Sequence, residues 1–257
     1  MASPVRPHIH LVIARYKENL DWLEDTLNTL GDKYDIRVYI YNKSQTLVKL
    51  PEEICGDHVT CKNLSNVGRE SHTYLTHIVE HYDKLKDGYI VCLQGDFKEH
   101  FKWYGMPQTP VQLVQNLIED AVANGRGSTS FANTWAHEIG HSCTAHYGFR
   151  ITAHAGERLD PRSPKCFGDW YNEFVGEWKN GEAWHTLPFW IGGLYAVAHT
   201  QILKRPLDFY ARLRDCVGVS LNPEVGHFME RAWLGIYGLV EPPNTPQAYI
   251  RKKGKLL

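Results

Sequence analysis

The sequence lacks any strong excess of charge of one sign. Its 257 residues contain 28 Lys and Arg against 29 Asp and Glu, so the formal net charge is −1. A chain this close to neutral has no overall field that would attract nucleic acid or an acidic membrane surface. Only the end of the chain, 251–255, is locally basic, which is typical of a solvated tail. We therefore expect no nucleic-acid partner.

Long apolar runs are also missing, although a helix needs about 20 mostly apolar residues to cross a membrane. The first apolar run lies near the N-terminus and is interrupted by Arg15 before any signal-like cleavage site. These two absences predict a chain without a membrane span or export signal. We expect it to be soluble and cytoplasmic.

The six cysteines include no CxxC pair, and two of them lie inside apolar segments. This pattern suits reduced, mostly buried thiols rather than a disulfide framework. Cys55, His58 and Cys61 are of the residue types that bind zinc, but a structural zinc site of this kind needs a second matching pair. The cysteines therefore give little support for a metal site.

The composition is that of a globular protein, with 43% hydrophobic and 12% aromatic residues. A chain of this length can bury a full core as one domain of the larger α/β size. Internal repeats and low-complexity linkers are absent, so no domain boundary is indicated. We expect a single domain over 1–257, with 239–257 as a C-terminal tail.

Apolar strands and amphipathic helices alternate through the first part of the chain. This alternation predicts a Rossmann-like α/β fold, with a mostly parallel sheet and helices on both of its faces. After the fourth strand, Thr109 is placed as the N-cap of a helix. The segment 124–133 reads as a flexible loop, and 187–198 as a strand. The four early strands are expected at 8–14, 36–41, 59–64 and 89–93.

Polar residues follow directly after the apolar part of each of these four strands. In open α/β sheets, ligands bind in the crevice beyond the carboxyl ends of the strands. Cations placed there can hold a diphosphate, amides and acids can bind base or sugar hydroxyls, and an acid can deprotonate an alcohol. We therefore expect a crevice for a phosphorylated, hydroxyl-rich ligand, formed by Arg15, Glu18, Asn42, Lys43, Arg69, Glu70, Gln94, Gly95 and Asp96.

Each of these positions also has a simpler interpretation. Arg15, Lys43 and Arg69 are able to pair with nearby acids on the surface, and Gln94 and Asp96 are able to cap the next segment and satisfy a turn. The repeated placement of polar groups after successive strands favours the functional interpretation.

A different chemistry is suggested by the HExxH string His137-Glu138-Ile139-Gly140-His141. On a helix this spacing places both imidazoles on one face to bind zinc, with Glu138 as the general base toward a zinc-bound water. Gly140 and the residues that follow make a poor metallopeptidase helix. A chain with 14 histidines can also contain such a string by chance, with its histidines lining a polar pocket.

Several segments together resemble a family of formerly uncharacterised domains of fungal, viral and bacterial proteins, which itself resembles glycosyltransferases of the GT-A fold. The resemblance runs from about Leu11 to Gly238, and the region from about Gly105 to Trp184 matches it poorly. The segments that carry it are VIARYKENLDWL, YIYNKS, NVGRESHTYLTHIVEHY, VCLQGDFKEH, GGLYAVAHTQILKRPLDFY and GHFMERAWLGIYG.

The resemblance implies a transferase that moves a sugar from a nucleotide diphosphate sugar to a hydroxyl acceptor, such as a glycan, with inversion. GT-A enzymes usually hold a divalent cation with a DxD motif, and the corresponding place here looks like Gln94-Gly95-Asp96, which has only one acid. Asp96 would then hold Mn or Mg with water and phosphate oxygens, or cationic residues would neutralise the diphosphate without metal. Gly192 and Gly193 would let donor and acceptor approach the backbone.

The resemblance also implies a catalytic base near the start of a late helix. Glu224 and Glu230 are the candidates, and Asp96 is a third catalytic candidate at the end of the fourth strand. For both glutamates the alternative is a structural role, either as a partner of the helix dipole or in a salt bridge with Arg231.

Two other classes of function stay open beside the transferase. One is a zinc hydrolase that uses His137 and His141. The other is a non-catalytic carbohydrate-binding protein that holds glycans through its tryptophan-rich stretch, Trp170, Trp178, Trp184 and Trp190.

Overall fold

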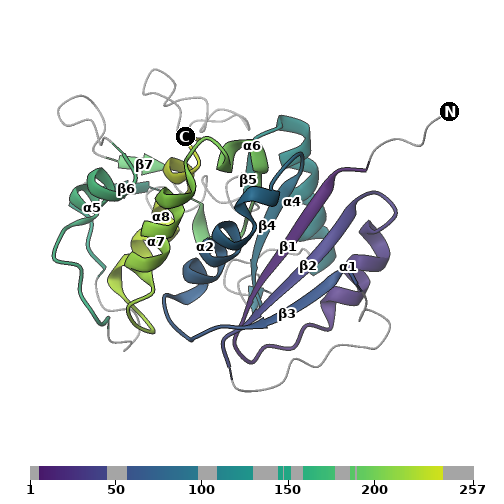
Figure 1. The fold of residues 1–257 in the computed structure, drawn as a ribbon, viewed down its shortest axis with the longest axis horizontal. Helices are drawn as coiled ribbons and strands as arrows, with labels where there is room; N and C mark the ends of the chain where they lie inside the picture. The colour runs from purple at the N-terminus through teal and green to yellow at the C-terminus, as the bar shows by residue number, and fades with distance from the viewer. Residues whose placement is uncertain are drawn as a thin grey trace, which may run out of the picture.

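The computed structural model describes most of the chain between residues 6 and 239. These residues form a mixed α/β fold in which one six-stranded sheet carries helices on both faces (Figure 1). None of the described helices is long and apolar enough to span a bilayer. The HExxH string, Cys55, Trp178 and Trp184 lie outside the described residues, which are 6–44, 57–97, 109–129, 144–146, 148–151, 159–176, 186–188 and 190–239.

The main sheet has the strand order β3-β2-β1-β4-β8-β5. Strands β1, β2, β3 and β4 run parallel to one another, whereas β8 runs antiparallel to both of its neighbours, β4 and β5. The α/β class and the mostly parallel sheet predicted from the sequence are thus confirmed. The strands are β1 (His8–Arg15), β2 (Asp35–Asn42), β3 (Val59–Asn63), β4 (Tyr89–Gln94), β5 (Gly127–Thr129) and β8 (Tyr195–Ala198).

Both faces of the sheet are buried, which explains why β1 reads as a continuous apolar run. On one face, Ile9, Leu11 and Ile13 of β1 pack with α1 (Trp22–Leu30) and α4 (Pro110–Asn124). Val12 and Ala14 point to the other face, where the core is completed by α2 (Arg69–His81), α7 (Leu207–Val217) and α8 (Glu224–Ile236).

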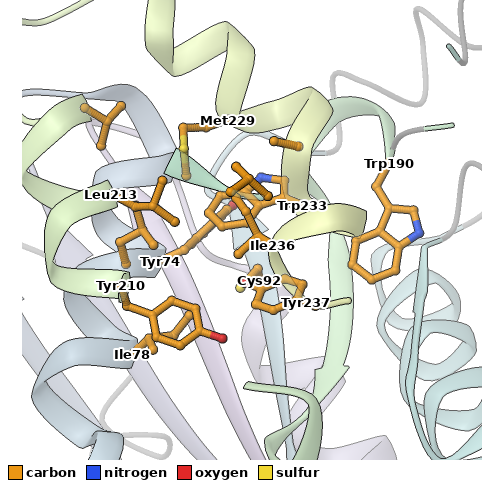
Figure 2. Close-up of a cluster of buried hydrophobic side chains, with 14 of the residues drawn as sticks. Tyr74, Ile78, Cys92, Trp190, Tyr210, Leu213, Met229, Trp233, Ile236 and Tyr237 are labelled. Atoms are coloured by element: carbon orange, nitrogen blue, oxygen red, sulfur yellow. The ribbon is translucent and has the colours of Figure 1, made fainter. Parts of the chain in front are cut away.

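An aromatic cluster fills the core between α2, α8 and β8 (Figure 2). Trp233 stacks on Tyr237 with ring centroids 5.7 Å apart, and Trp190 stacks on Tyr195 at 5.1 Å. Trp170 and Trp190 are only 2% and 4% exposed. These two tryptophans therefore build the core, and they offer no surface on which a glycan could stack.

Two segments differ from the sequence prediction. The strand predicted at 187–198 is broken, because Gly192 and Gly193 adopt φ of 74° and 62° and form a turn before β8. The predicted loop 124–133 contains β5, which pairs with β8. The predicted N-cap is confirmed, since Thr109 and Gln112 form a capping box. The remaining elements are β6 (Thr144–His146), β7 (Thr186–Pro188), α5 (Phe167–Phe174), α6 (His199–Ile202), η2 (Tyr82–Lys84) and η3 (Ile191–Gly193).

Candidate functional site

A cleft of about 720 Å³ lies beyond the carboxyl ends of β1, β2 and β4. The chain passes from β1 to β2 on one side of β1 and later adds β4 on the other side, so this edge is a topological switch point of the sheet. Its volume is that of a small-molecule site. The lining residues are Ala14, Arg15, Tyr16, Glu18, Lys43, Asn66, Arg69, Glu70, Gln94, Asp96, Asp160, Ser220, Leu221 and Asn222.

The register of the strands brings the predicted site residues together. Arg15 lies opposite Asn42 in the β1–β2 pair, and Ala14 lies opposite Gln94 in the β1–β4 pair. The three strand ends therefore stand side by side at the cleft.

Arg15 mainly holds the cleft wall in shape. Its Nη1 donates to Asn42 Oδ1 at 2.8 Å, and its Nε donates to the Glu18 carbonyl oxygen at 2.9 Å. The side chains of Arg15 and Asn42 are both buried. This pair fixes the segment after β1 onto the end of β2.

Glu18 folds back over the turn that follows β1. Its Oε2 accepts hydrogen bonds from the backbone N–H groups of Tyr16, at 2.5 Å, and Lys17, at 3.1 Å. A Cβ atom added to Gly95 would lie only 2.7 Å from this oxygen. A side chain at this position after β4 would therefore force the Glu18 side chain to shift, because the Glu18 carboxylate lies against the backbone there.

Lys43 supports the tight turn that leads into α2. Its buried Nζ donates to the carbonyl oxygens of Val67, at 2.6 Å, and Arg69. Burial lowers the pKa of Lys43 to about 8, and the Glu70 carboxylate opposes this effect. Gly68 and Arg69 both have positive φ, 63° and 51°, which is uncommon for an arginine. The turn thus presents Arg69 and Glu70 to the cleft in a conformation that the surroundings must enforce.

We expect Lys43→Met to lower the free energy of unfolding by about 2 to 3 kcal/mol, because the carbonyl groups of Val67 and Arg69 both lose a charged donor. Urea unfolding measures the change. Lys33→Met is the matched control: Lys33 is exposed and lies 4.0 Å from Glu119, so its loss should change stability by less than about 1 kcal/mol. Equal effects of the two substitutions would contradict the supporting role of Lys43.

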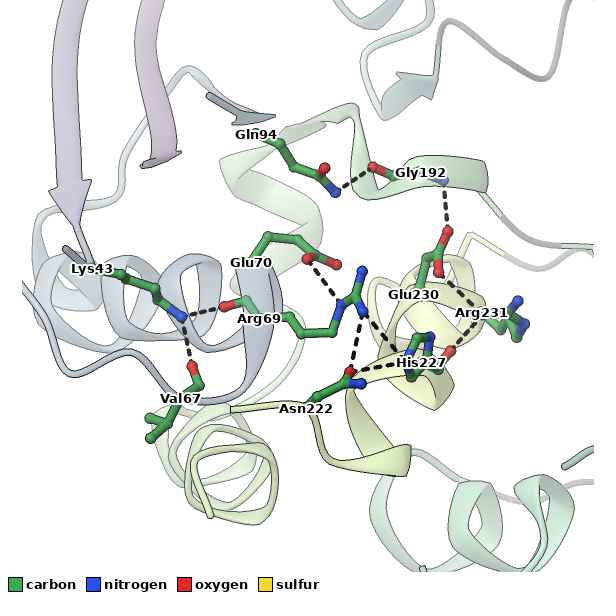
Figure 3. Close-up of polar contacts among 10 residues, drawn as sticks. All are labelled: Lys43, Val67, Arg69, Glu70, Gln94, Gly192, Asn222, His227, Glu230 and Arg231. Atoms are coloured by element: carbon green, nitrogen blue, oxygen red, sulfur yellow. Dashed lines mark hydrogen bonds and ion pairs between the residues drawn. The ribbon is translucent and has the colours of Figure 1, made fainter. Parts of the chain in front are cut away.

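Arg69 connects α2 with the start of α8 across the cleft (Figure 3). Its Nη1 donates to Asn222 Oδ1 at 3.1 Å, and its Nε lies 3.7 Å from Glu70 Oε2. The Glu70 side chain lines the cleft and is 9% exposed. Gly193 leaves room beside it, since an added Cβ would lie 3.4 Å from Glu70 Cγ.

Glu230 lies behind the glycine turn rather than in the cleft lining. Its Oε1 accepts from the Gly192 N–H at 2.8 Å, and its Oε2 lies 3.1 Å from Arg231 Nη1. Gln94 holds the same turn from the other side, because its Nε2 donates to the Gly192 carbonyl oxygen at 2.9 Å. Gln94, Gly192 and Glu230 thus form a continuous connection from β4 to α8 (Figure 3).

The two neighbouring carboxyl groups have pKa values shifted in opposite directions. Burial raises the pKa of Glu70, the charge of Glu230 raises it further, and Arg69 opposes the rise. Burial also acts to raise the pKa of Glu230, but Arg231, the Gly192 N–H and Arg69 outweigh it and leave the pKa below its ordinary value. Of the two carboxyl groups, Glu70 is therefore the one that is more readily protonated.

Glu224, the other glutamate proposed as a base, is not part of the cleft lining. Its carboxylate is fully buried and accepts from the backbone N–H groups of Ile151, at 3.1 Å, and Ser163, at 3.0 Å. Arg150 Nη1 lies 3.1 Å and Arg162 Nη1 3.6 Å from its oxygens. Glu224 therefore anchors the segments around 150 and 163 to the first turn of α8.

Asp96 lines the cleft at the end of β4, where it is partly exposed. Within the described ranges, no group of three or more His, Cys, Asp or Glu side chains is arranged to hold a metal ion. A cation at Asp96 would therefore need ligand oxygens from a bound substrate and from water.

A model of the family described as "Protein of unknown function (DUF3431)" matches residues 11–250. The chain belongs to the DUF3431 family. The matched range includes every residue that lines the cleft. No curated protein matches the chain.

Part of the cleft in this DUF3431 protein was not predicted from its sequence. Asn66, Asp160, Ser220, Leu221 and Asn222 complete the cleft lining. The position of Asn222 just before a helix could be seen in the sequence, because Asn-Pro-Glu marks the start of α8. Nothing in the sequence indicates that it would meet Arg69, which lies 153 positions earlier.

Proposed function

We propose that this DUF3431 protein is a glycosyltransferase that moves a sugar from a nucleoside diphosphate sugar to a hydroxyl group of a glycan acceptor. The observation that carries the proposal is the cleft at the switch point of the sheet. It gathers guanidinium, ammonium, amide and carboxylate groups from three adjacent strand ends and from the first turn of α2. These are the groups that a protein needs to bind a diphosphate linked to two hydroxyl-rich rings.

The donor would bind with its diphosphate near Arg69 and Lys43, which both line the cleft. Arg15 would contribute charge while it holds the wall. Asp96 and Asn66 line the same cleft, and they would accept hydrogen bonds from ribose or sugar hydroxyls. Asp96 is also the carboxylate that would join Mn or Mg to the diphosphate.

In the transfer step, the acceptor oxygen forms a bond to the anomeric carbon while the bond from that carbon to the diphosphate oxygen breaks. The electron pair of the broken bond leaves with the nucleoside diphosphate. Glu70 takes the proton of the acceptor hydroxyl, because it is the cleft carboxylate whose pKa is raised by burial. Direct displacement of this kind inverts the configuration of the anomeric carbon.

Nucleotide binding tests the proposal. We expect at least one of the uridine, guanosine, adenosine and thymidine diphosphates, or its sugar, to raise the melting temperature. A ligand at 100 times its Kd adds about 2.7 kcal/mol to the free energy of unfolding. Differential scanning fluorimetry with and without manganese measures the effect. If none of the four diphosphates stabilises the fold in either condition, the transferase proposal is wrong.

An Asp96→Asn variant separates metal-assisted from metal-free binding. We expect it to fold normally and to lose the part of the nucleotide stabilisation that depends on manganese. Asp83→Asn, at an exposed position in η2, is the matched control and should keep that part. Unchanged manganese dependence in Asp96→Asn would remove Asp96 from the diphosphate site.

A further inference from the structure

Five histidines form a cluster at the end of the sheet opposite the cleft. They come from three elements: His8 and His10 from β1, His77 and His81 from α2, and His199 from the start of α6. Three of the rings are almost fully buried, since His10, His77 and His199 are 4%, 0% and 1% exposed. Such a concentration of buried imidazoles has no part in the proposed transfer reaction.

Hydrogen bonds connect this cluster into a chain that crosses β2, β1 and α2. Asp35 Oδ2 lies 2.8 Å from His8 Nδ1, and His8 Nε2 lies 3.1 Å from His10 Nε2. His10 Nδ1 then lies 3.0 Å from His77 Nε2, and His77 Nδ1 lies 3.0 Å from the Tyr41 hydroxyl. The chain thus ties α2 to two strands of the sheet.

The hydrogen-bonded chain from Asp35 to Tyr41 can hold only a limited number of protons. A neutral imidazole has one N–H group, so all links are satisfied when Tyr41 donates to His77, His77 to His10, His10 to His8 and His8 to Asp35. One added proton can be accommodated by reversing the links, with a charged His8 beside Asp35 and Tyr41 donating to Glu80. A second added proton would place two N–H groups face to face.

His199 closes the cluster on the side of β4. Its Nδ1 lies 3.2 Å from the Lys86 carbonyl oxygen, which can only accept, so the N–H is at Nδ1. Its Nε2 is buried without a hydrogen-bond partner among the described residues, and its ring centroid is 5.2 Å from that of His10. A proton added to this nitrogen would be a buried charge next to another imidazole.

The surroundings keep the imidazoles of His10, His77 and His199 neutral near neutral pH. Burial and, to a smaller extent, the neighbouring histidines lower the pKa of His10 to about 2, and burial lowers the pKa of His199 to about 4. Burial also lowers the pKa of His77 well below its ordinary value. The charged groups around the cluster are of both signs and do not cancel this effect: Asp35, Arg37, Lys62, Glu80, Lys84 and Asp87.

The cluster and the cleft share three structural elements, β1, α2 and β2, and β1 carries both His10 and Arg15. Helix α2 carries His77 and His81 in its last turns and presents Arg69 and Glu70 to the cleft in its first turn. Tyr41 directly precedes Asn42 and Lys43, which shape the cleft from β2. We propose that the histidine cluster is an acid-sensitive latch, which holds α2 on β1 and β2 while its rings are neutral and releases α2 when they take up protons.

The sign of the pH dependence follows from the neutral rings. Below about pH 6.5 the unfolded chain binds protons at His10, His77 and His199 and the folded chain does not, so acid favours unfolding. Each buried ring multiplies the unfolding equilibrium constant by up to about tenfold per pH unit in this range. Stability lost on acidification is regained as the pH rises through the ordinary histidine value.

Hydrogen exchange and thermal unfolding of the ligand-free chain test the latch independently of any transferase activity. Between about pH 7.5 and pH 5.5, and after correction for intrinsic exchange, we expect α2 amides to lose more protection than those of α4, on the opposite face of the sheet. His199→Phe and His77→Gln should each reduce the pH dependence of unfolding by up to about tenfold per pH unit. The exposed His58→Gln is the matched control and should leave it unchanged.

Two results would overturn this inference. The first is a pH dependence that is the same in the wild type, His199→Phe and His77→Gln. The second is a zinc-induced rise in melting temperature that His199→Phe removes, because the cluster would then be a metal site rather than a latch.

Discussion

Replacing Glu70 with glutamine is expected to lower the rate of sugar transfer at least about a hundredfold, because a positioned general base contributes roughly 10²- to 10⁴-fold to a reaction. Glutamine has nearly the same shape but cannot accept the acceptor's proton. Since ionised Glu70 is buried in the cleft, the variant should fold at least as stably as the wild type. Nucleotide binding should also be retained, because the cationic groups of the cleft are unchanged.

The pH profile distinguishes a base from a merely structural Glu70. In the wild type, the rate should rise with pH as Glu70 loses its proton, and the inflection should lie above the ordinary carboxyl value because burial raises the pKa of Glu70. Glu70→Gln should lack this inflection. In Glu230→Gln the inflection should remain but move to lower pH, since Glu230 does not line the cleft and its charge raises the pKa of Glu70. A Glu70→Gln enzyme with the wild-type rate and profile would remove Glu70 from the chemistry.

Glu224→Gln is expected to lower the free energy of unfolding by about 2 to 3 kcal/mol, because hydrogen bonds to a charged group each contribute about 1.5 to 3 kcal/mol and the arginine partners are 41% and 55% exposed. The substituted amide group would turn a donor toward one of the groups that now donate to the carboxylate. For a chain of this size the change corresponds to a fall in Tm of roughly 4 to 12 °C. Urea unfolding with an unchanged dependence on denaturant would confirm that the effect is on stability.

The matched control for this prediction is Glu173→Gln. Glu173 pairs with Lys165 at 2.8 Å, but both side chains are nearly half exposed, so its loss should cost about 0 to 1 kcal/mol. A similar loss in both variants would show that Glu224 does not anchor the 150 and 163 segments. At a temperature where both variants are folded, Glu224→Gln should also retain transfer activity.

The strand ends could be predicted from the sequence because they depend on local patterns. An apolar run that stops at Arg15, Asn42 or Gln94 marks the end of a buried strand, and parallel pairing then places these ends together. No further information was needed to bring Arg15, Lys43 and Asp96 into one cleft.

The roles of individual residues depend on contacts that local patterns do not contain. Glu224 looks like an ordinary first-turn acid, and only the fold shows that two backbone N–H groups and two arginines surround it. The raised pKa of Glu70 arises from burial and from Glu230, which is 160 positions away in the chain. The glycine pair was read as part of a strand because positive φ values cannot be seen in a sequence.

The reversed direction of β8 has a consequence for communication within the molecule. Because this strand runs opposite to β4, it begins beside the glycine turn that Gln94 and Glu230 hold at the cleft. It finishes at Ala198, next to His199 in the histidine cluster. A single strand of four residues therefore has one end near the cleft and the other in the histidine cluster. A shift of β8 along its axis would move residues in both regions.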